Sequence, residues 1–369
     1  MKKRTNNNDK LIEIIFRSII PICLSIIIMI NGFGNTVNDI LRICIDVADP
    51  EVSSLFLGVN KKSSTSMNIQ ENNDLSEKEI FSSSLRSNIP EDVIDIMYKA
   101  QETYLNSTND GKIEEVDYSV QGATSQWNGI YLKNTTLDHQ ADISDYINRK
   151  INADIDTTKP VVLIYHTHTC EAYELLDRGY YTNARDVRSE NERENIVRVG
   201  EEVCKTLEEK GYKTIHNKTV YDTEYSGAYE RSYKDISKII KENPSIQVVL
   251  DIHRGSIYQK DGTRIKTVTT INGTKAAQVL ILSGCEDGNV KDFPNWEQNL
   301  TFALNLQKYI VQDNPGLARP LMFCSRRYNM HVLPCALQIE IGTDANTLAE
   351  AVYSARLFAL SLADMLGEL

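Results

Sequence analysis

The clearest hydrophobic pattern in the chain begins at Pro160, where short apolar runs alternate with amphipathic segments. Val161–Tyr165 is a continuous apolar run, which is typical of a strand buried in a parallel sheet. Between 192 and 210, apolar residues recur every three or four positions and Gly211 follows, which predicts a helix. The same patterns predict strands at 213–216, 245–252, 276–282, 321–325 and 336–341, and helices at 228–242, 295–312 and 347–366. We therefore expect an α/β fold, a three-layer sandwich whose mostly parallel central sheet is covered by helices on both faces.

A second apolar stretch lies near the start of the chain. Residues 18–32 contain no charge, and a membrane span there would run from about Phe16 to about Phe33. A basic cluster precedes it, which predicts that residues beyond about 35 lie outside the cytoplasm. Since no clear cleavage site follows, we expect 1–35 to be a cytoplasmic tip and an uncleaved transmembrane anchor.

The segment between the anchor and the strand-rich region has little apolar periodicity. Residues 59–90 are rich in Ser, Asn and charged residues, so 36–90 is expected to be a flexible spacer. A short helix is expected from Glu91 to Tyr104, but the rest of 91–158 has patterning too weak to assign. The catalytic domain is expected at 159–369.

Composition excludes several classes of protein. The chain has 369 residues, of which 41% are apolar and 25% are charged, which suits a globular protein with attachments. Its net charge of -11 argues against a nucleic-acid partner, because such a partner needs a basic face. The seven cysteines form no CxxC pair, so neither a zinc ribbon nor a thioredoxin motif is present.

Polar residues that suit metal chemistry follow or interrupt three of the predicted strands. The first strand is followed by His166, His168 and Glu171, and the strand near 250 ends with Asp251, His253 and Arg254, while Glu340 lies within the last strand. In open α/β sheets, ligands bind at the carboxyl ends of the strands. We expect His168, Glu171 and His253 to hold Zn²⁺, since a catalytic zinc takes three protein ligands and keeps one open position.

The two histidines of the first strand end leave an alternative. Residues two apart share a face of an extended chain, so His166 is expected to lie on the cleft side with His168. Either ring is a candidate ligand, and the other then contacts the substrate or supports the ligands.

The remaining polar residues have expected roles as well as simpler explanations. Glu340 is expected to take a proton from a zinc-bound water and return it to the leaving amine, unless it only forms a salt bridge with Arg254, Arg326 or Arg327. Asp251 is expected to support a ligand histidine, and Arg254 to steady an oxyanion or a substrate carboxylate. Cys170 is more simply a space-filling residue than a nucleophile.

Four segments together resemble one known family. They are LIYHTHTCEAY (163–173), NIVRVGEEV (195–203), VVLDIHR (248–254) and LQIEIGTDANTLAEA (337–351), and the chain is similar in them to the stage II sporulation protein P family. The resemblance implies a zinc-dependent N-acetylmuramoyl-L-alanine amidase with endopeptidase activity, acting on peptidoglycan during engulfment. It also implies the sporulation proteins D and M as partners, and a place in the mother-cell membrane facing the septal space. Gly255 and Cys170 depart from the family's pattern.

Two rival functions remain at this point. The same residues would serve a zinc carboxypeptidase acting on the stem peptide, and a wall-binding module without catalysis would also keep them. Cleavage products and bound zinc would distinguish these cases.

Overall fold

The computed structural model describes residues 88–369, and these all fall within one compact unit. The expected anchor and all but the last three residues of the expected spacer lie outside that range. Within it, no helix combines the length and apolarity that a membrane span requires.

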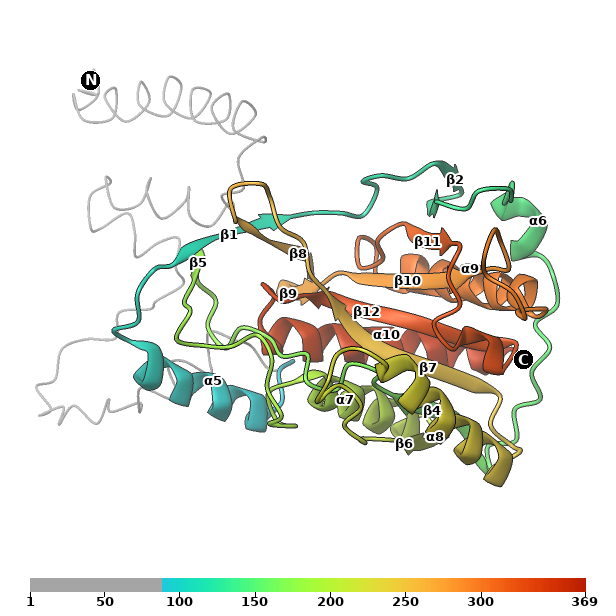
Figure 1. Cartoon of the computed structure of the whole chain (residues 1–369), viewed down its shortest axis with the longest axis horizontal. Coiled ribbons are helices and arrows are strands. Elements are labelled where there is room, and N and C mark those ends of the chain that lie inside the picture. The colour runs from blue at the N-terminus through green and yellow to red at the C-terminus, as the bar shows by residue number, and fades with distance from the viewer. Residues whose placement is uncertain (1–87) are drawn as a thin grey trace, which may run out of the picture. The chain divides into compact units, whose positions relative to one another are not determined.

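An eight-stranded sheet forms the centre of the fold (Figure 1). Its strands, in spatial order, are β2 (Ser125–Trp127), β3 (Ile130–Asn134), β11 (Leu321–Cys324), β10 (Val279–Gly284), β12 (Cys335–Thr343), β7 (Val248–Gly255), β4 (Pro160–Tyr165) and β6 (Lys213–His216). Neighbours from β12 to β6 are parallel, and so are β10, β11 and β3. The direction reverses between β10 and β12 and between β2 and β3. The α/β class and the mostly parallel sheet are confirmed. The sheet consists of two blocks of parallel strands, and the two blocks run in opposite directions.

Helices cover both faces of this sheet. The helices α7 (Ile196–Glu209), α9 (Trp296–Asp313) and α10 (Leu348–Leu366) share one apolar core with alternate residues of the strands, such as Ile164 and Ile252. On the opposite face, Ile236 of α8 (Ala228–Glu242) packs against Leu163 and Val249. Side-chain caps fix two helix starts. The Asn195 side chain accepts a hydrogen bond from the Val197 N–H before α7, and Thr347 begins α10 with a capping box.

The region that sequence patterning left unassigned joins this unit. Only its first helix was expected, and α5 (Glu91–Tyr104) confirms it. The helices α5 and α6 (Ile143–Ile147) add residues to the main core, and β3 extends the central sheet. The strand β1 (Gly111–Val116) belongs to a second sheet, in the order β5 (Tyr180–Tyr181), β1, β8 (Arg264–Ile271) and β9 (Thr274–Ala277). The strand predicted at 276–282 is therefore two strands, β9 and β10, which belong to different sheets.

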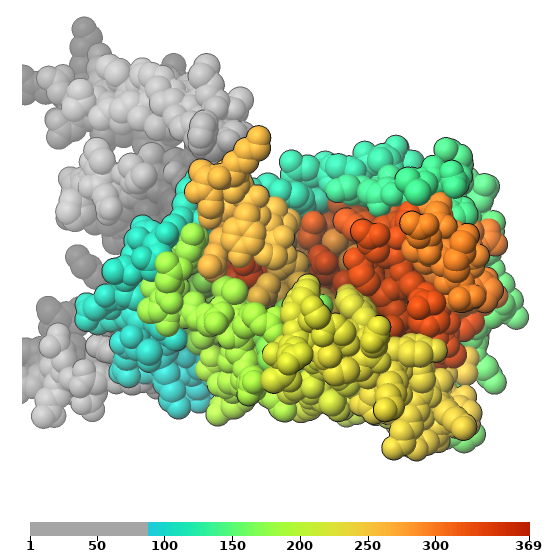
Figure 2. Space-filling view, in the orientation of Figure 1, coloured from blue at the N-terminus to red at the C-terminus, as the bar shows by residue number. Residues whose placement is uncertain are grey.

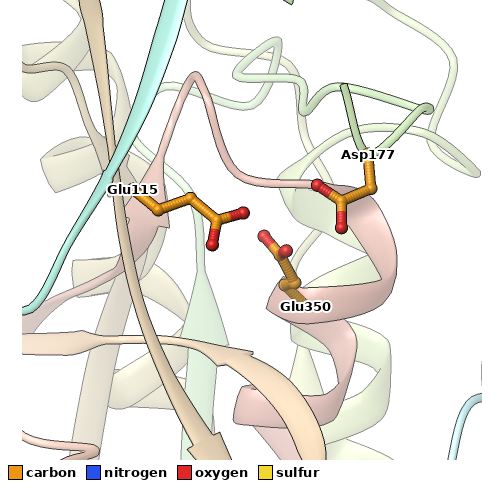
Figure 3. A group of neighbouring side chains, drawn as sticks. All are labelled: Glu115, Asp177 and Glu350. Atoms are coloured by element: carbon orange, nitrogen blue, oxygen red, sulfur yellow. The ribbon is translucent and has the colours of Figure 1, made fainter. Parts of the chain in front are cut away.

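A buried lysine ties the second sheet to the main core. Lys266 of β8 is 1% exposed, and its Nζ lies 2.7 Å from Glu350 of α10, 2.6 Å from Asp177 and 3.1 Å from Glu115 of β1. Figure 3 shows the three carboxyl groups turned toward one another. Their oxygens lie within 4.8 Å, which would suit a metal ion, but the Lys266 ammonium already supplies a positive charge among them. The cluster is explained as an ion-pair network.

Replacing this lysine should weaken the fold. Lys266→Met is expected to lower the free energy of unfolding by about 2–4 kcal/mol, because Glu350 would keep a buried charge without its partner. Asp177 and Glu115 are each 43% exposed, so water limits the loss. Lys275→Met, at a lysine that contacts the same two exposed carboxylates, should cost less than about 1 kcal/mol. Urea denaturation of both variants tests this, and equal losses would contradict it.

Candidate active site

The parallel strands β4, β7 and β12 bring most of the expected site residues to one edge of the sheet. Tyr165 pairs with Asp251, and His253 pairs with Glu340, so these strands end side by side. His168 and Glu171 lie in the turn that follows β4. All are mostly buried; His253 lies near both Glu171 and His168, and Glu340 shares its face of the sheet by register.

His253 lies between two carboxylates. Its Nδ1 is 3.3 Å from Glu171 Oε2, and its Nε2 is 2.8 Å from Asp251 Oδ1, although this second contact lacks hydrogen-bond geometry. Burial alone would lower the pKa of His253, but the charges of Asp251 and Glu171 outweigh it and raise the pKa well above its usual value. For Glu171, burial is likewise outweighed by the positive charge of His253, which lowers the pKa to about 2. The two carboxylates therefore create a strong preference for a positive charge here.

His168 is buried among three other rings. Its ring centroid lies 5.4 Å from that of His253, and the exposed Tyr225 stacks on its other side at 4.3 Å. Its Nδ1 is buried without a hydrogen bond, 3.8 Å from Asp222 Oδ2. Burial, and then the charge of His253, lower the pKa of His168, so this ring is neutral at pH 7 and has a lone pair to offer.

The buried carboxylate Asp222 was missed by the sequence analysis. It accepts a hydrogen bond of 2.7 Å from Arg188 and another from the Cys170 N–H, and it faces His168 Nδ1. Such a carboxylate orients a metal-binding histidine by engaging the ring nitrogen that does not bind the metal. Cys170 is a buried residue whose pKa is raised to about 12, chiefly by burial, so it is no thiolate nucleophile.

Glu340 has the environment expected of a proton carrier. Burial raises the pKa of its carboxyl group, and the charges of Arg319 and His253 only partly oppose this. Its nearest ion-pair partner in the described residues is Arg319 at 4.0 Å, and none of the three arginines considered from the sequence pairs with it. A carboxylate this weakly paired remains available for proton transfer.

Gly255 leaves room for that carboxylate. A Cβ at this position would lie 3.0 Å from Glu340 Oε2 and 3.3 Å from the Gly342 carbonyl oxygen. Gly342 itself has φ +67° at the bulge of β12, and a Cβ there would lie 2.7 Å from Asn346 Oδ1. The departure at Gly255 is therefore explained by space for Glu340.

Filling this space should impair turnover more than stability. Gly255→Ala is expected to lower kcat about tenfold by displacing Glu340, while the overpacking costs about 1–2 kcal/mol of unfolding free energy. Steady-state kinetics and thermal denaturation measure the two effects. Gly179→Ala, where no atom lies within 4 Å of the added Cβ and the backbone is likewise not left-handed, is the matched control. An unchanged kcat in Gly255→Ala would contradict the explanation.

The expectation that His166 shares the cleft side with His168 is wrong. The chain leaves the strand conformation after Tyr165, so two-residue spacing no longer keeps the rings on one face. His166 is fully buried toward α7, where Gly200 leaves space for it. Its Nδ1 donates to the Ile252 carbonyl oxygen and its Nε2 accepts from His216, both at 2.8 Å. A substrate contact by this ring does not fit, and it instead supports the strand that carries His253.

The expected catalytic role of Arg254 also does not fit the structure. Its guanidinium donates to the carbonyl oxygens of Ala172, Gly255 and Val187, and it is 8% exposed. All three nitrogens of the guanidinium therefore already donate hydrogen bonds to the backbone, although this group was expected to steady an oxyanion. Arg254 fixes the loop after β4, and its N–H also donates to Glu171 Oε2.

The donor set suits a zinc ion. Two imidazoles and a carboxylate, with one position left for water, are ligands that catalytic zinc takes. Ligand atoms about 2.05 Å from a tetrahedral zinc are about 3.3 Å apart, which is the separation of His253 Nδ1 and Glu171 Oε2. His168 would complete the set through Nε2, because its Nδ1 faces Asp222. Among the described residues only Glu115, Asp177 and Glu350 bring three ligand atoms within 4.8 Å of one another, so His168 would have to move closer to His253 and Glu171 to bind the same ion.

The sequence matches a known protein family. The model of the family described as stage II sporulation protein P matches residues 56–363, which is most of the chain. The chain belongs to the stage II sporulation protein P family. A curated member of that family, stage II sporulation protein P of Bacillus subtilis, is 30% identical over 204 residues. The match covers 52% of this chain and 47% of that relative, so the chain spans about half the length of its relative.

The present chain is also similar to solved structures of amidases. The CwlD amidase of Clostridioides difficile, solved with the GerS lipoprotein, has 11% identity, covers 57% of this chain and all of its own, and has a TM-score of 0.35. The N-acetylmuramoyl-L-alanine amidase AmiC2 of Nostoc punctiforme has 12% identity, covers 58% and 99% of the two chains, and has a TM-score of 0.32.

Proposed function

We propose that this protein is a zinc-dependent peptidoglycan hydrolase that acts as an N-acetylmuramoyl-L-alanine amidase with associated endopeptidase activity. The carrying observation is the convergence of His168, Glu171, His253 and Glu340 at one sheet edge, where buried carboxylates favour a positive charge. Membership of the stage II sporulation protein P family supports the wall substrate.

His168, Glu171 and His253 would hold the zinc. Asp251 lies beside Nε2 of His253 and Asp222 beside Nδ1 of His168, which leaves His253 Nδ1 and His168 Nε2 for the metal. A bound zinc would polarise a water molecule and lower its pKa toward neutrality. The raised pKa of His253 favours its protonated form without a metal, so protons and zinc would compete for this ring and zinc affinity should fall as the pH decreases.

Glu340 would move the proton during hydrolysis. Its carboxylate would accept a proton from the attacking water and donate it to the leaving amine, which is the general acid–base role that a raised carboxyl pKa suits. The bond we propose is the amide between the lactyl group of N-acetylmuramic acid and L-alanine.

The decisive experiment combines metal analysis with digestion of sacculi. We expect about one zinc per chain, loss of muropeptide release after chelation, and recovery with Zn²⁺. Mass spectrometry of the products identifies the bond, since an amidase frees intact stem peptides and a carboxypeptidase frees single amino acids. Full activity of the zinc-free protein would reject the metal mechanism, and absence of any product would favour a wall-binding module.

The cellular setting is part of the same proposal. We infer a single N-terminal membrane span, a catalytic domain outside the cytoplasm facing the septal space, and action with sporulation proteins D and M during engulfment. The family and the basic residues before the apolar N-terminal stretch support it. A reporter fused after residue 60 should be active only in its extracytoplasmic form.

A further inference from the structure

A cavity of about 290 Å³ opens between α8 and the segment that follows β11. Figure 2 shows the surface of α8, in yellow, beside the orange to red surface of the C-terminal third. The cavity is lined mainly by aromatic and charged side chains, namely Tyr229, Glu230, Tyr233, Arg327, Tyr328 and His331. Its volume lies at the small end of ligand pockets, so it would hold one residue-sized unit.

Two stacked pairs of rings form the walls of this cavity. Tyr229 of α8 stacks on Tyr328 with ring centroids 5.1 Å apart, and Tyr233, one helical turn later, stacks on His331 at 5.0 Å. Offset stacks of this kind are rigid and present flat apolar surface at little entropic cost. The cavity is thus a built pocket whose walls come from two separate elements.

The backbone beside the pocket is strained and firmly held. Tyr328 has φ +38° and Asn329 has φ +59°, which is rare for a bulky residue such as tyrosine. The Asn329 side chain donates to the Tyr229 carbonyl oxygen at 3.1 Å and to Ser232 Oγ at 3.0 Å. Gly284 makes the turn possible, because a Cβ there would lie 1.9 Å from the Arg326 carbonyl oxygen. Strain held this firmly is characteristic of functional sites.

One ring links the pocket to the candidate active site. The Tyr229 centroid lies 5.6 Å from that of His168 and 6.5 Å from that of His253, while the same ring lines the pocket. Its hydroxyl donates to Gln338 Oε1 on β12, which fixes the ring. The Tyr229 ring therefore separates the pocket from the two candidate ligand histidines and contacts both.

The pocket also offers an arginine without an acidic partner. Arg327 donates one hydrogen bond, of 3.3 Å, to the Lys291 carbonyl oxygen and forms no ion pair within residues 88–369. Glu230 lines the same pocket, so the arginine must outweigh one negative charge there. A guanidinium that has free N–H groups and lies beside aromatic rings suits a ligand that carries a carboxylate on a short aliphatic chain.

From this geometry we propose that the pocket binds the stem peptide of peptidoglycan next to the bond that is cut, with Arg327 pairing with the free α-carboxylate of the second residue. This inference rests on the proposed function, because it takes peptidoglycan as the substrate. The second residue follows L-alanine directly, so a substrate whose cut bond lies at the candidate ligands would place this residue beside Tyr229, which also lines the pocket. Tyr328 and Tyr229 would contact the aliphatic part of the same residue.

Binding of two matched probes tests the proposal. N-acetylmuramoyl-L-alanyl-D-glutamate and N-acetylmuramoyl-L-alanyl-D-isoglutamine differ only in that carboxylate, which is an amide in the second. Calorimetry would use the full chain with zinc and the Glu340→Gln background, so that no turnover occurs. We expect the acid to bind about tenfold more tightly than the amide, and Arg327→Gln to abolish that preference. Arg326→Gln, at the adjacent exposed arginine outside the pocket, should keep it.

A second variant tests the aromatic wall. Tyr328→Asn removes the ring while asparagine tolerates the left-handed backbone, so both probes should bind severalfold more weakly with the acid preference intact. A preference for the acid that survives Arg327→Gln would overturn the proposal, and so would equally tight binding of N-acetylmuramic acid alone, which would assign the pocket to the sugar. If sacculi are cleaved without an Arg327-dependent preference, the subsite is wrong and the hydrolase stands. An Arg327-dependent preference without any cleavage would instead reject the hydrolase and keep the subsite.

Discussion

His168→Ala is expected to remove both zinc and hydrolytic activity, whereas His166→Ala should keep the zinc. The reason is their opposite placement, because His168 faces His253 across the candidate zinc site and His166 is buried behind the sheet against α7. Losing a group that only supports a ligand weakens metal affinity about 10–100-fold, so losing a ligand should exceed about a hundredfold. Metal analysis after gel filtration, together with muropeptide release, measures both effects.

The His166 variant is the matched control for this experiment. It removes the same ring two residues away, and it should cost about 2–3 kcal/mol of unfolding free energy by leaving a cavity and an unpaired His216. Its activity should decrease only as far as the strand that carries His253 shifts. Loss of zinc from His166→Ala with retention in His168→Ala would reverse the assignment, even though the reaction class would stand.

The strands and helices that carry the site follow from clean local patterns. The apolar runs of β4, β7 and β12 and the three- to four-residue periods of α7, α8 and α10 specify buried elements, and their boundaries agree with prediction to within a few residues. Sheet direction is not encoded in this way, so the reversal between β10 and β12 was unforeseen. The strand β8 was missed because Lys266 and the threonines of this strand interrupt any apolar run. The carboxylates that stabilise the buried lysine, such as Glu350, are far from it in the sequence, so no local pattern reveals them.

The candidate site was predictable where its residues follow strands and unpredictable where they lie in loops. His253 and Glu340 occupy strand positions whose neighbours are set by register, so their proximity follows from the parallel order. Asp222 lies between β6 and α8, and nothing local indicates that it faces His168. One overlooked signal exists. Tyrosines recur at every fourth position from 221 to 233, and the rings at 225 and 229 lie against His168. Only 229 and 233 belong to α8, so the recurrence marks aromatic residues near the site and not one face of a helix.

Glu340→Gln is expected to lower kcat by about a hundredfold to ten-thousandfold while zinc remains bound. The amide keeps the size of the side chain but cannot accept a proton from water, and general acid–base catalysis contributes about that factor. The ligands His168, Glu171 and His253 are unchanged, so metal content should equal that of the native protein. Glu242→Gln, at an exposed glutamate at the end of α8, should be indistinguishable from the native protein in both measurements.

The alternative role for Glu340 makes a different prediction. If the carboxylate only balanced the charge of Arg319, 4.0 Å away, then Glu340→Gln would lower stability by leaving that buried arginine without a partner and would leave turnover nearly intact. The raised pKa favours proton transfer, because a carboxylate held by a strong ion pair would have a lowered pKa instead. Single-turnover kinetics on sacculi with parallel thermal denaturation therefore separates the two roles: slow cleavage in a stable protein identifies a proton carrier, and normal cleavage in a destabilised protein identifies a structural ion pair.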